Sequence, residues 1–107
     1  MADALAIILT EAPGPRFDAA MELALTWNAL DRPVGVLLKE GALRGLAGPP
    51  ADLLGQALAD GVRVHVCQTS LDALGLAFNH PPLPDGVQAM GLVGFLLELP
   101  GAQVVIA

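Results

Sequence analysis

The chain has 107 residues, of which 54% are hydrophobic and 15% are charged, and its net charge is −6. This length suits a single domain, residues 1–107, with one core. The acidic balance and the scattered basic residues exclude a nucleic-acid-binding surface, and a lone cysteine excludes an internal disulfide.

The first half of the chain predicts two strands with a long helix between them. The run Ala4–Leu9 is short, continuous and apolar, which is typical of a strand buried on both faces. A Pro-Gly-Pro turn separates it from Phe17–Leu30, whose narrow polar stripe predicts a helix that is covered on more than one side. Val34–Leu38 predicts the second strand, and Ala42–Gly48 is left open as a single helical turn.

The second half continues the alternation of helices and strands. Asp52–Asp60 predicts a helix that ends before a glycine, and Val62–Val66 predicts the third strand. Thr69 or Ser70 is expected to cap a helix that reaches about Phe78, because an aspartate three residues after Thr69 fits a capping box. The remaining predicted elements are the strand Val87–Met90, the helix Gly91–Leu99 and the strand Gln103–Ile106.

This alternation predicts an α/β fold. Short apolar strands separated by helices are typical of a parallel sheet with helices on both faces, so we expect one three-layer domain with five parallel strands. We choose the flavodoxin-like strand order 2-1-3-4-5, which places the first strand beside the third.

Cys67 is the residue that carries the clearest chemical signal. It follows the third strand and precedes a helix start, which is where open α/β sheets place their ligand sites. Backbone N–H groups at a helix start, here those of Thr69 and Ser70, favour a thiolate over a thiol. The alternative is an inert buried cysteine, because free cysteine is among the most buried residue types.

Right-handed crossovers place every strand-to-helix loop on the same edge of the sheet as Cys67. The cationic residues of those loops, Arg16, Lys39 and Arg44, are therefore candidate neighbours of the thiol. His80 follows a helix, so we place it at the opposite edge and not among the catalytic residues. Two histidines and one cysteine set far apart give no metal site by spacing, and no cofactor motif is present.

Arg63 and His65 share one face of the third strand with Cys67, because side chains two residues apart point the same way. Polar residues on an inner strand suggest thin helix cover on that face. Their roles stay open between polar groups satisfied within the chain, a subunit contact and a water-bridged link to the thiol.

The excess of apolar residues predicts a homo-oligomer, because one small domain cannot cover so much apolar surface. Leu23 and Trp27, four residues apart on the nearly all-apolar helix, are expected at or near a subunit contact. A membrane span is the weaker alternative, since Pro100 and Gly101 interrupt the best apolar stretch. The chain start is unlike a secretory signal, so we expect a cytoplasmic protein.

The ordered set of elements resembles the DsrE-like family of small sulfur-relay proteins over nearly the whole chain. The resemblance rests on the segment Leu37-Leu38-Lys39-Glu40-Gly41-Ala42-Leu43, on Gly61 to Cys67, where the family places its sulfur-carrying cysteine, and on Gly75-Leu76 and Gly86-Val87. The resemblance implies a five-stranded parallel sheet and an assembly of copies, a trimer first and a hexamer second. Leu74 stands where many relay members have an arginine, and the segment between Gly41 and Pro50 is shorter than in relatives.

Two functions follow as expectations. The resemblance implies a sulfur carrier or sulfurtransferase that accepts sulfane sulfur as a persulfide on Cys67 and passes it to a partner thiol, with sulfur donor and acceptor proteins as partners. The alternative is a non-catalytic homo-oligomeric binding or scaffold protein that retains the fold, which Leu74 and the apolar excess favour. Whether the chain is an enzyme is left open between the two.

Overall fold

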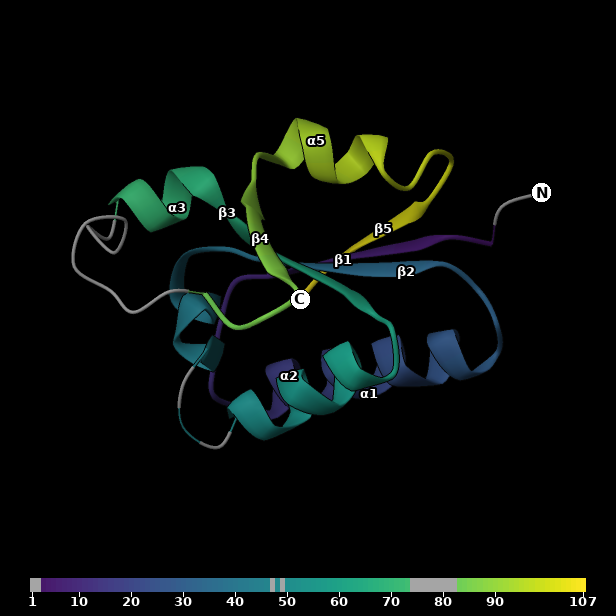
Figure 1. Cartoon of the computed structure of the whole chain (residues 1–107), viewed down its shortest axis with the longest axis horizontal. Coiled ribbons are helices and arrows are strands. Elements are labelled where there is room, and N and C mark those ends of the chain that lie inside the picture. The colour runs from purple at the N-terminus through teal and green to yellow at the C-terminus, as the bar shows by residue number, and fades with distance from the viewer. Residues whose placement is uncertain (1–2, 47, 49, 74–82) are drawn as a thin grey trace.

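The computed structural model describes residues 3–46, 48, 50–73 and 83–107. Strands and helices alternate along the chain, with one 3₁₀ helix, η1, after the second strand (Figure 1). The elements are β1 (Leu5–Leu9), α1 (Pro15–Ala29), β2 (Val34–Leu38), η1 (Glu40–Leu46), α2 (Pro50–Ala59), β3 (Arg63–Cys67), α3 (Gln68–Ala73), β4 (Val87–Met90), α5 (Leu92–Leu97) and β5 (Gln103–Ile106).

The five predicted strands are confirmed to within one residue at each end, and the segment after β2 is a 3₁₀ helix rather than a single helical turn. The start of α3 differs from the prediction. The helix begins at Gln68, directly after β3, so Thr69 and Ser70 lie inside its first turn and do not cap it. Asp72 accepts a hydrogen bond from Gln68 Nε2 at 2.9 Å, which replaces the expected capping box. The predicted continuation to Phe78 lies outside the described residues.

All five strands are parallel, as predicted, but their order is β4-β3-β2-β1-β5. The predicted order 2-1-3-4-5 is therefore wrong: β3 pairs with β2 and not with β1. The polar content of the strands does not give the order. Val34–Leu38 holds no polar residue and lies inside the sheet, and β4 contains Gln88 and forms an edge, but β3 contains Arg63 and His65 and also lies inside.

The strand order explains where the helices lie. The steps β1 to β2 and β2 to β3 run in one direction across the sheet, so right-handed crossovers place α1 and α2 on the same face. The step from β4 to β5 runs back across the sheet, so α5 lies on the opposite face, as Figure 1 shows. Helices on both faces are thus confirmed.

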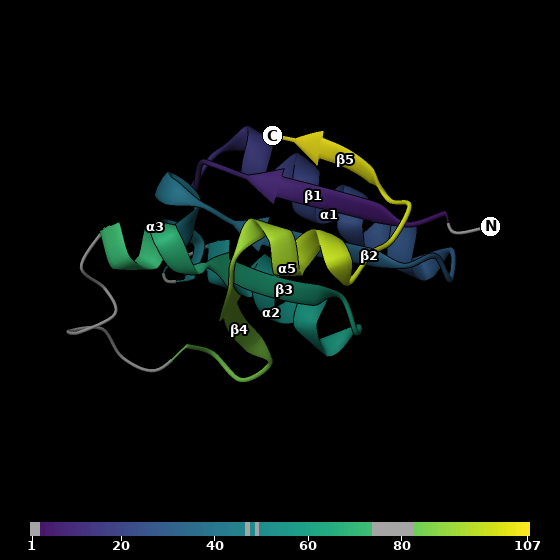
Figure 2. The ribbon, with the colours of Figure 1, turned by 90° about the horizontal axis from the view of Figure 1, so that it is seen from above.

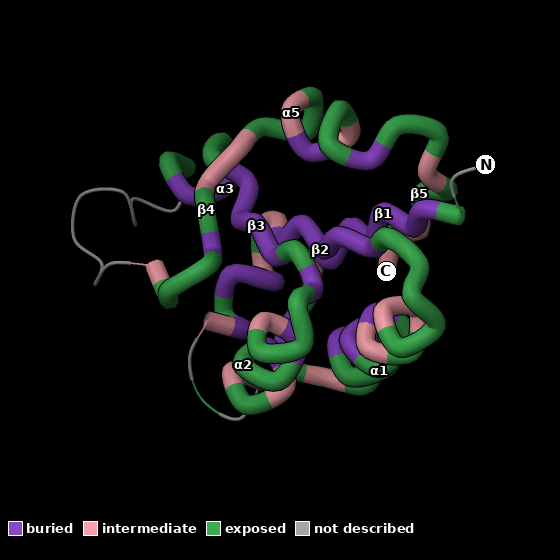
Figure 3. The backbone as a smooth tube through the Cα atoms, turned by 45° about the vertical axis from the view of Figure 1, so that its right-hand side comes forward, coloured by how far each residue is buried: buried purple, intermediate pink, exposed green. Residues whose placement is uncertain are grey.

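The two faces are covered unequally. The face under α1 and α2 holds the larger core, which includes Phe17, Met21 and Leu54. The other face holds a smaller cluster, formed by Ala4, Ala6, Ile8, Leu37, Cys67, Phe95 and Leu99. In Figure 2, α5 lies in front of β2 and β3, while β1 and β5 are seen beside it. Figure 3 shows the same contrast, with β1 and β2 buried and α5 largely exposed on its outer side.

The apolar surplus that the composition predicts lies mainly on α5 and β5. Val93, Leu97 and Ile106 are each more than 70% exposed, whereas Leu23 on α1 is 37% exposed. α1 turns Phe17 and Met21 into the core, so fewer of its apolar side chains reach the surface than its sequence suggests. Among the helices in the described ranges, none combines the length and the apolar character that a membrane crossing requires.

Candidate functional site

A cavity of about 480 Å³ opens where β2 and β3 end. Its volume is in the range of small-molecule sites. The lining comes from the turn and 3₁₀ helix after β2, from the junction of β3 and α3, and from the first residue of α5. The lining residues are Lys39, Glu40, Gly41, Arg44, Cys67, Thr69, Ser70, Ala73 and Leu92.

The turn after β2 brings the two cationic residues to this cavity. Glu40 has a φ of 50°, a left-handed conformation, and it redirects the chain from β2 into η1. Gly41 then passes close to β1, because a Cβ at this position would lie 3.0 Å from the Thr10 carbonyl oxygen. A side chain at position 41 would therefore push η1, and Arg44 with it, away from the sheet.

Cys67 is the last residue of β3 and is 4% exposed, so it presents a small part of its surface to the cavity. Burial raises the pKa of its thiol. The Ser70 backbone N–H and hydroxyl and the Thr69 backbone N–H donate hydrogen bonds to the sulfur, and the charge of Lys39 adds to their effect. These contributions outweigh burial, so the pKa of Cys67 lies below its ordinary value.

The structure brings Lys39 and Arg44 to the cavity that Cys67 lines, together with Thr69 and Ser70. Arg16 is not in that set. It lines a second cavity with Leu23, Val105 and Ile106, beside α1 and β5. The reason is the strand order: β2 lies between β1 and β3, so the loop after β2 and not the loop after β1 adjoins Cys67.

Two lining residues were missed by the sequence analysis. Ala73 is the last residue of α3, and Leu92 is the first residue of α5. The sequence analysis considered the strand-to-helix loops, and Ala73 and Leu92 lie in helices and carry no chemical signal of their own. His80, Leu74 and Gly75-Leu76 lie outside the described residues.

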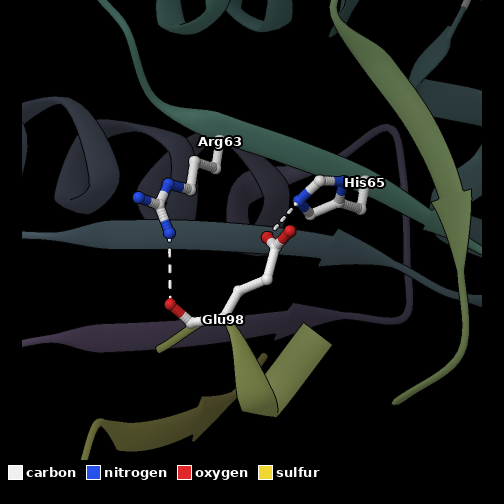
Figure 4. Close-up of polar contacts among 3 residues, drawn as sticks. All are labelled: Arg63, His65 and Glu98. Carbon is white, nitrogen blue, oxygen red and sulfur yellow. Dashed lines mark hydrogen bonds and ion pairs between the residues drawn. The ribbon is translucent and has the colours of Figure 1, made fainter. Parts of the chain in front are cut away.

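A group of polar side chains, the Glu98 cluster (Arg63, His65 and Glu98), lies on the α5 side of β3 (Figure 4). His65 Nε2 lies 2.9 Å from Glu98 Oε1, and Arg63 Nη1 donates to the Glu98 backbone oxygen at 3.1 Å. Arg63 and one ring nitrogen of His65 thus find partners within the chain, which agrees with one of the alternatives left open, whereas His65 Nδ1 has no hydrogen-bond partner in the described structure. The thin cover expected on this face is also found, because α5 is a six-residue helix.

The described part of the chain holds no group of three His, Cys, Asp or Glu side chains that could bind a metal ion. The chemical groups that line the cavity are a thiol of lowered pKa, two cationic side chains, one carboxylate and the hydroxyl-bearing residues Thr69 and Ser70. This set suits a reaction at sulfur that begins and ends with a thiolate.

No protein-family model and no curated protein sequence matches the chain. Solved structures do match. The ychN protein of E. coli has a TM-score of 0.80 and 19% sequence identity, and the match covers 100% of both chains. A protein of unknown function from Methanobacterium thermoautotrophicum has a TM-score of 0.77 and 16% identity over 97% of this chain and 98% of its own. At these identities the likeness shows the fold.

Proposed function

We propose that this chain is a DsrE-like sulfur carrier, in which Cys67 accepts sulfane sulfur as a persulfide and passes it to a partner thiol. The observation that carries the proposal is the environment of Cys67. Its thiol receives hydrogen bonds from Ser70 and Thr69 and lines a cavity that also holds Lys39 and Arg44. The resemblance of the chain to the sulfur-relay family, with its cysteine in register, supports the same function.

The proposed reaction consists of two exchanges at sulfur. The Cys67 thiolate attacks the outer sulfur of a donor persulfide, R–S–SH. A new bond joins Cys67 Sγ to that sulfur, the bond between the two donor sulfurs breaks, and the donor leaves as the thiolate R–S⁻. An acceptor thiolate then attacks the outer sulfur of the Cys67 persulfide. The bond between that sulfur and Cys67 Sγ breaks, and Cys67 is released as a thiolate. Sulfur, charge and electrons balance without an added oxidant or reductant.

The residues around the thiol have separate roles in this proposal. The N–H groups of Thr69 and Ser70 and the Ser70 hydroxyl stabilise the thiolate, both before the first exchange and after the second. Lys39 and Arg44 attract anionic sulfur donors and stabilise the charge on the persulfide. The proteins that donate and accept the sulfur are the expected partners, and the cytoplasm is the expected compartment.

A sulfane-sulfur transfer assay tests the proposal. The wild-type protein is incubated with a low-molecular-weight persulfide, and the mass of the intact chain is measured. We expect a gain of one sulfur atom that a thiol acceptor removes, and no gain in Cys67→Ser. A wild-type chain that the persulfide leaves unmodified, under conditions where iodoacetamide alkylates Cys67, would contradict the sulfur-carrier function.

The second function is a non-catalytic homo-oligomeric scaffold. The observation that favours it is burial: Cys67 is 4% exposed, while Val93, Leu97 and Ile106 expose a large apolar surface. The reactivity of Cys67 discriminates between the two functions. Native protein whose thiol is alkylated only after unfolding would favour the scaffold.

We propose that the chain assembles into a homo-oligomer, with a trimer as the first choice and a hexamer as the second. In this proposal Leu23 and Trp27 lie at or near the contact between subunits. Trp27 is partly engaged within the chain, since its Nε1 donates to the Asp3 backbone oxygen at 2.7 Å and Arg32 lies 5.2 Å from its ring centroid. Light scattering measures the assembly, and a mass of one 11.0 kDa chain would contradict it. Leu23→Glu is expected to reduce the measured mass of the assembly if α1 forms the contact between subunits.

A further inference from the structure

The helix α5 lies over Cys67 and limits access to it. The side chain of Cys67 belongs to the small apolar cluster beneath α5, together with Phe95 and Leu99. Leu92, the first residue of α5, forms part of the wall of the cavity that Cys67 lines. The packing of α5 thus contributes to the burial of Cys67, which is 4% exposed.

Apolar contact holds α5 on the sheet through the small cluster of β1, β2 and β3 residues, and its tightest approach at a glycine is at Gly35 of β2. An added Cβ at Gly35 would lie 2.8 Å from Leu99 Cδ1 and 3.1 Å from Phe95 Cε1. The helix thus approaches the strand closely because residue 35 has no side chain. Both Phe95 and Leu99 are buried there, while Val93 and Leu97 on the outer side of α5 are each 74% exposed.

Polar contact holds the end of α5 on β3 through Glu98, the residue that follows the helix. Its carboxylate binds His65 Nε2 and its backbone oxygen accepts from Arg63, so one residue connects to two positions of the strand that ends in Cys67 (Figure 4). His65 is 6% exposed, and its Nδ1 is buried without a hydrogen-bond partner in the described structure. Because an ionised carboxylate accepts hydrogen bonds and does not donate them, Nε2 is the ring nitrogen that donates to Glu98.

We propose that α5 is a movable cover over Cys67 and that Glu98 is the positioning residue that keeps it closed. A six-residue helix with an exposed outer side, held by a small apolar cluster and by the contacts of Glu98, can separate from the sheet while the larger core on the other face stays intact. This inference rests on the proposed function in one respect: in a sulfur carrier, opening of α5 admits the donor to Cys67.

The test is the rate at which native protein reacts with a low concentration of iodoacetamide, followed by the mass of the intact chain. Glu98→Ala removes the carboxylate bound to His65, and Gly35→Ala displaces Phe95 and Leu99 by contact without changing a polar group. We expect each variant to be alkylated about tenfold faster than wild type. In Glu98→Ala this corresponds to the loss of one charge-assisted hydrogen bond, and in Gly35→Ala to the displacement of two buried apolar side chains.

Matched controls separate the cover from general effects of substitution. Glu22→Ala removes an exposed carboxylate from α1, on the other side of the sheet. Gly55→Ala adds a methyl group in α2, where an added Cβ meets nothing within 4 Å. Both controls are expected to react at the wild-type rate.

Repeating the alkylation in low concentrations of urea distinguishes opening of α5 from unfolding of the whole chain. Local opening exposes little surface, so the rate should rise weakly with urea, whereas unfolding of the whole chain gives a steep rise. Wild-type rates in both Glu98→Ala and Gly35→Ala, or a steep urea dependence that matches their unfolding curves, would overturn the proposal. The sulfur-transfer assay is interpreted separately. Faster alkylation of the variants without uptake of sulfur would support α5 as a movable cover and contradict the sulfur-carrier function.

Discussion

The two faces of the sheet differ in what covers them. On one face, α1 and α2 enclose a large apolar core that contains Phe17 and Met21 and contacts every inner strand. On the other face, α5 covers β2 and β3 through Phe95 and Leu99, and polar side chains of β3 lie beneath it. β1 and β2 are buried along their whole length, so both faces of these two strands are covered.

The two faces also differ in how much they contribute to the free energy of unfolding and in which of them holds Cys67. Burial of apolar area is the main favourable term in folding, so the α1 and α2 face supplies most of the free energy of unfolding. The α5 face buries less, and it holds Cys67, His65 and Glu98. Cys67 therefore lies on the face whose cover, in our proposal, is displaced at the smaller cost in free energy.

The largest expected effect is on the α1 face. Phe17 is fully buried and packs against Gly45, since an added Cβ there would lie 2.7 Å from the Phe17 ring. Phe17→Ala should lower the free energy of unfolding by about 3–5 kcal/mol, as is usual for a buried phenylalanine. Urea denaturation measures this loss. Leu30→Ala, at a position that is 56% exposed, is the control and should change stability by about 0.5 kcal/mol or less.

The second effect compares Phe95 with Phe17, since both are fully buried. Phe95→Ala should cost less free energy of unfolding than Phe17→Ala, because the loss cannot exceed the free energy that docks α5 on the sheet. The same variant should increase the alkylation rate of native Cys67, whereas Phe17→Ala should do so only through unfolding of the whole chain. Equal stability losses in the two variants would show that the faces unfold as one unit.

The fold could be predicted from the sequence because short apolar runs and helical patterns alternate along the chain. The strand order could not, because β1 and β2 are apolar on both faces and differ little in pattern. The edge strands β4 and β5 contain Gln88 and Gln103, but the inner strand β3 contains Arg63 and His65, so polar residues do not separate edge strands from inner ones.

The candidate site was predictable in part. Cys67 follows from its place between a strand and a helix, and Lys39 and Arg44 follow from the shared edge of a parallel sheet. The separation of Arg16 from this group depends on the strand order, so the sequence could not exclude it. The pairing of Glu98 with His65 depends on how α5 returns over the sheet, and residues 33 positions apart give no local signal for it.

The next prediction concerns the thiol on the α5 face. The pKa of Cys67 lies below its ordinary value because hydrogen bonds from Ser70 and Thr69 outweigh burial. A lowered pKa leaves more thiolate at neutral pH, so alkylation should rise with pH through a midpoint below that of an unperturbed cysteine. Ser70→Ala removes the hydroxyl donor and should move the midpoint to higher pH and slow the reaction at neutral pH several-fold.

Thr69→Ala is the matched control for Ser70→Ala, because Thr69 contributes its backbone N–H and that group survives the substitution. The midpoint in Thr69→Ala should equal that of wild type. A shift of equal size in both variants would mean that the hydroxyl of Ser70 has no specific effect on the thiolate. The alkylation rate of each variant is expressed relative to its own plateau at high pH, so that a difference in the opening of α5 does not affect the comparison of midpoints.

The smallest expected effect tests whether the charge of Lys39, after β2, lowers the pKa of the Cys67 thiol at the end of β3. Lys39 comes from the end of β2 and lowers the pKa of Cys67 through its charge alone, without a hydrogen bond. Lys39→Met keeps most of the side-chain volume and removes the charge, so the alkylation midpoint should rise, by less than in Ser70→Ala. Because Lys39 is half-buried at the cavity, added salt should reduce the difference between wild type and Lys39→Met. Salt should leave the difference between wild type and Ser70→Ala unchanged, since a hydrogen bond inside the protein is not screened. A salt-independent effect of Lys39→Met would show that the residue acts by packing rather than by charge.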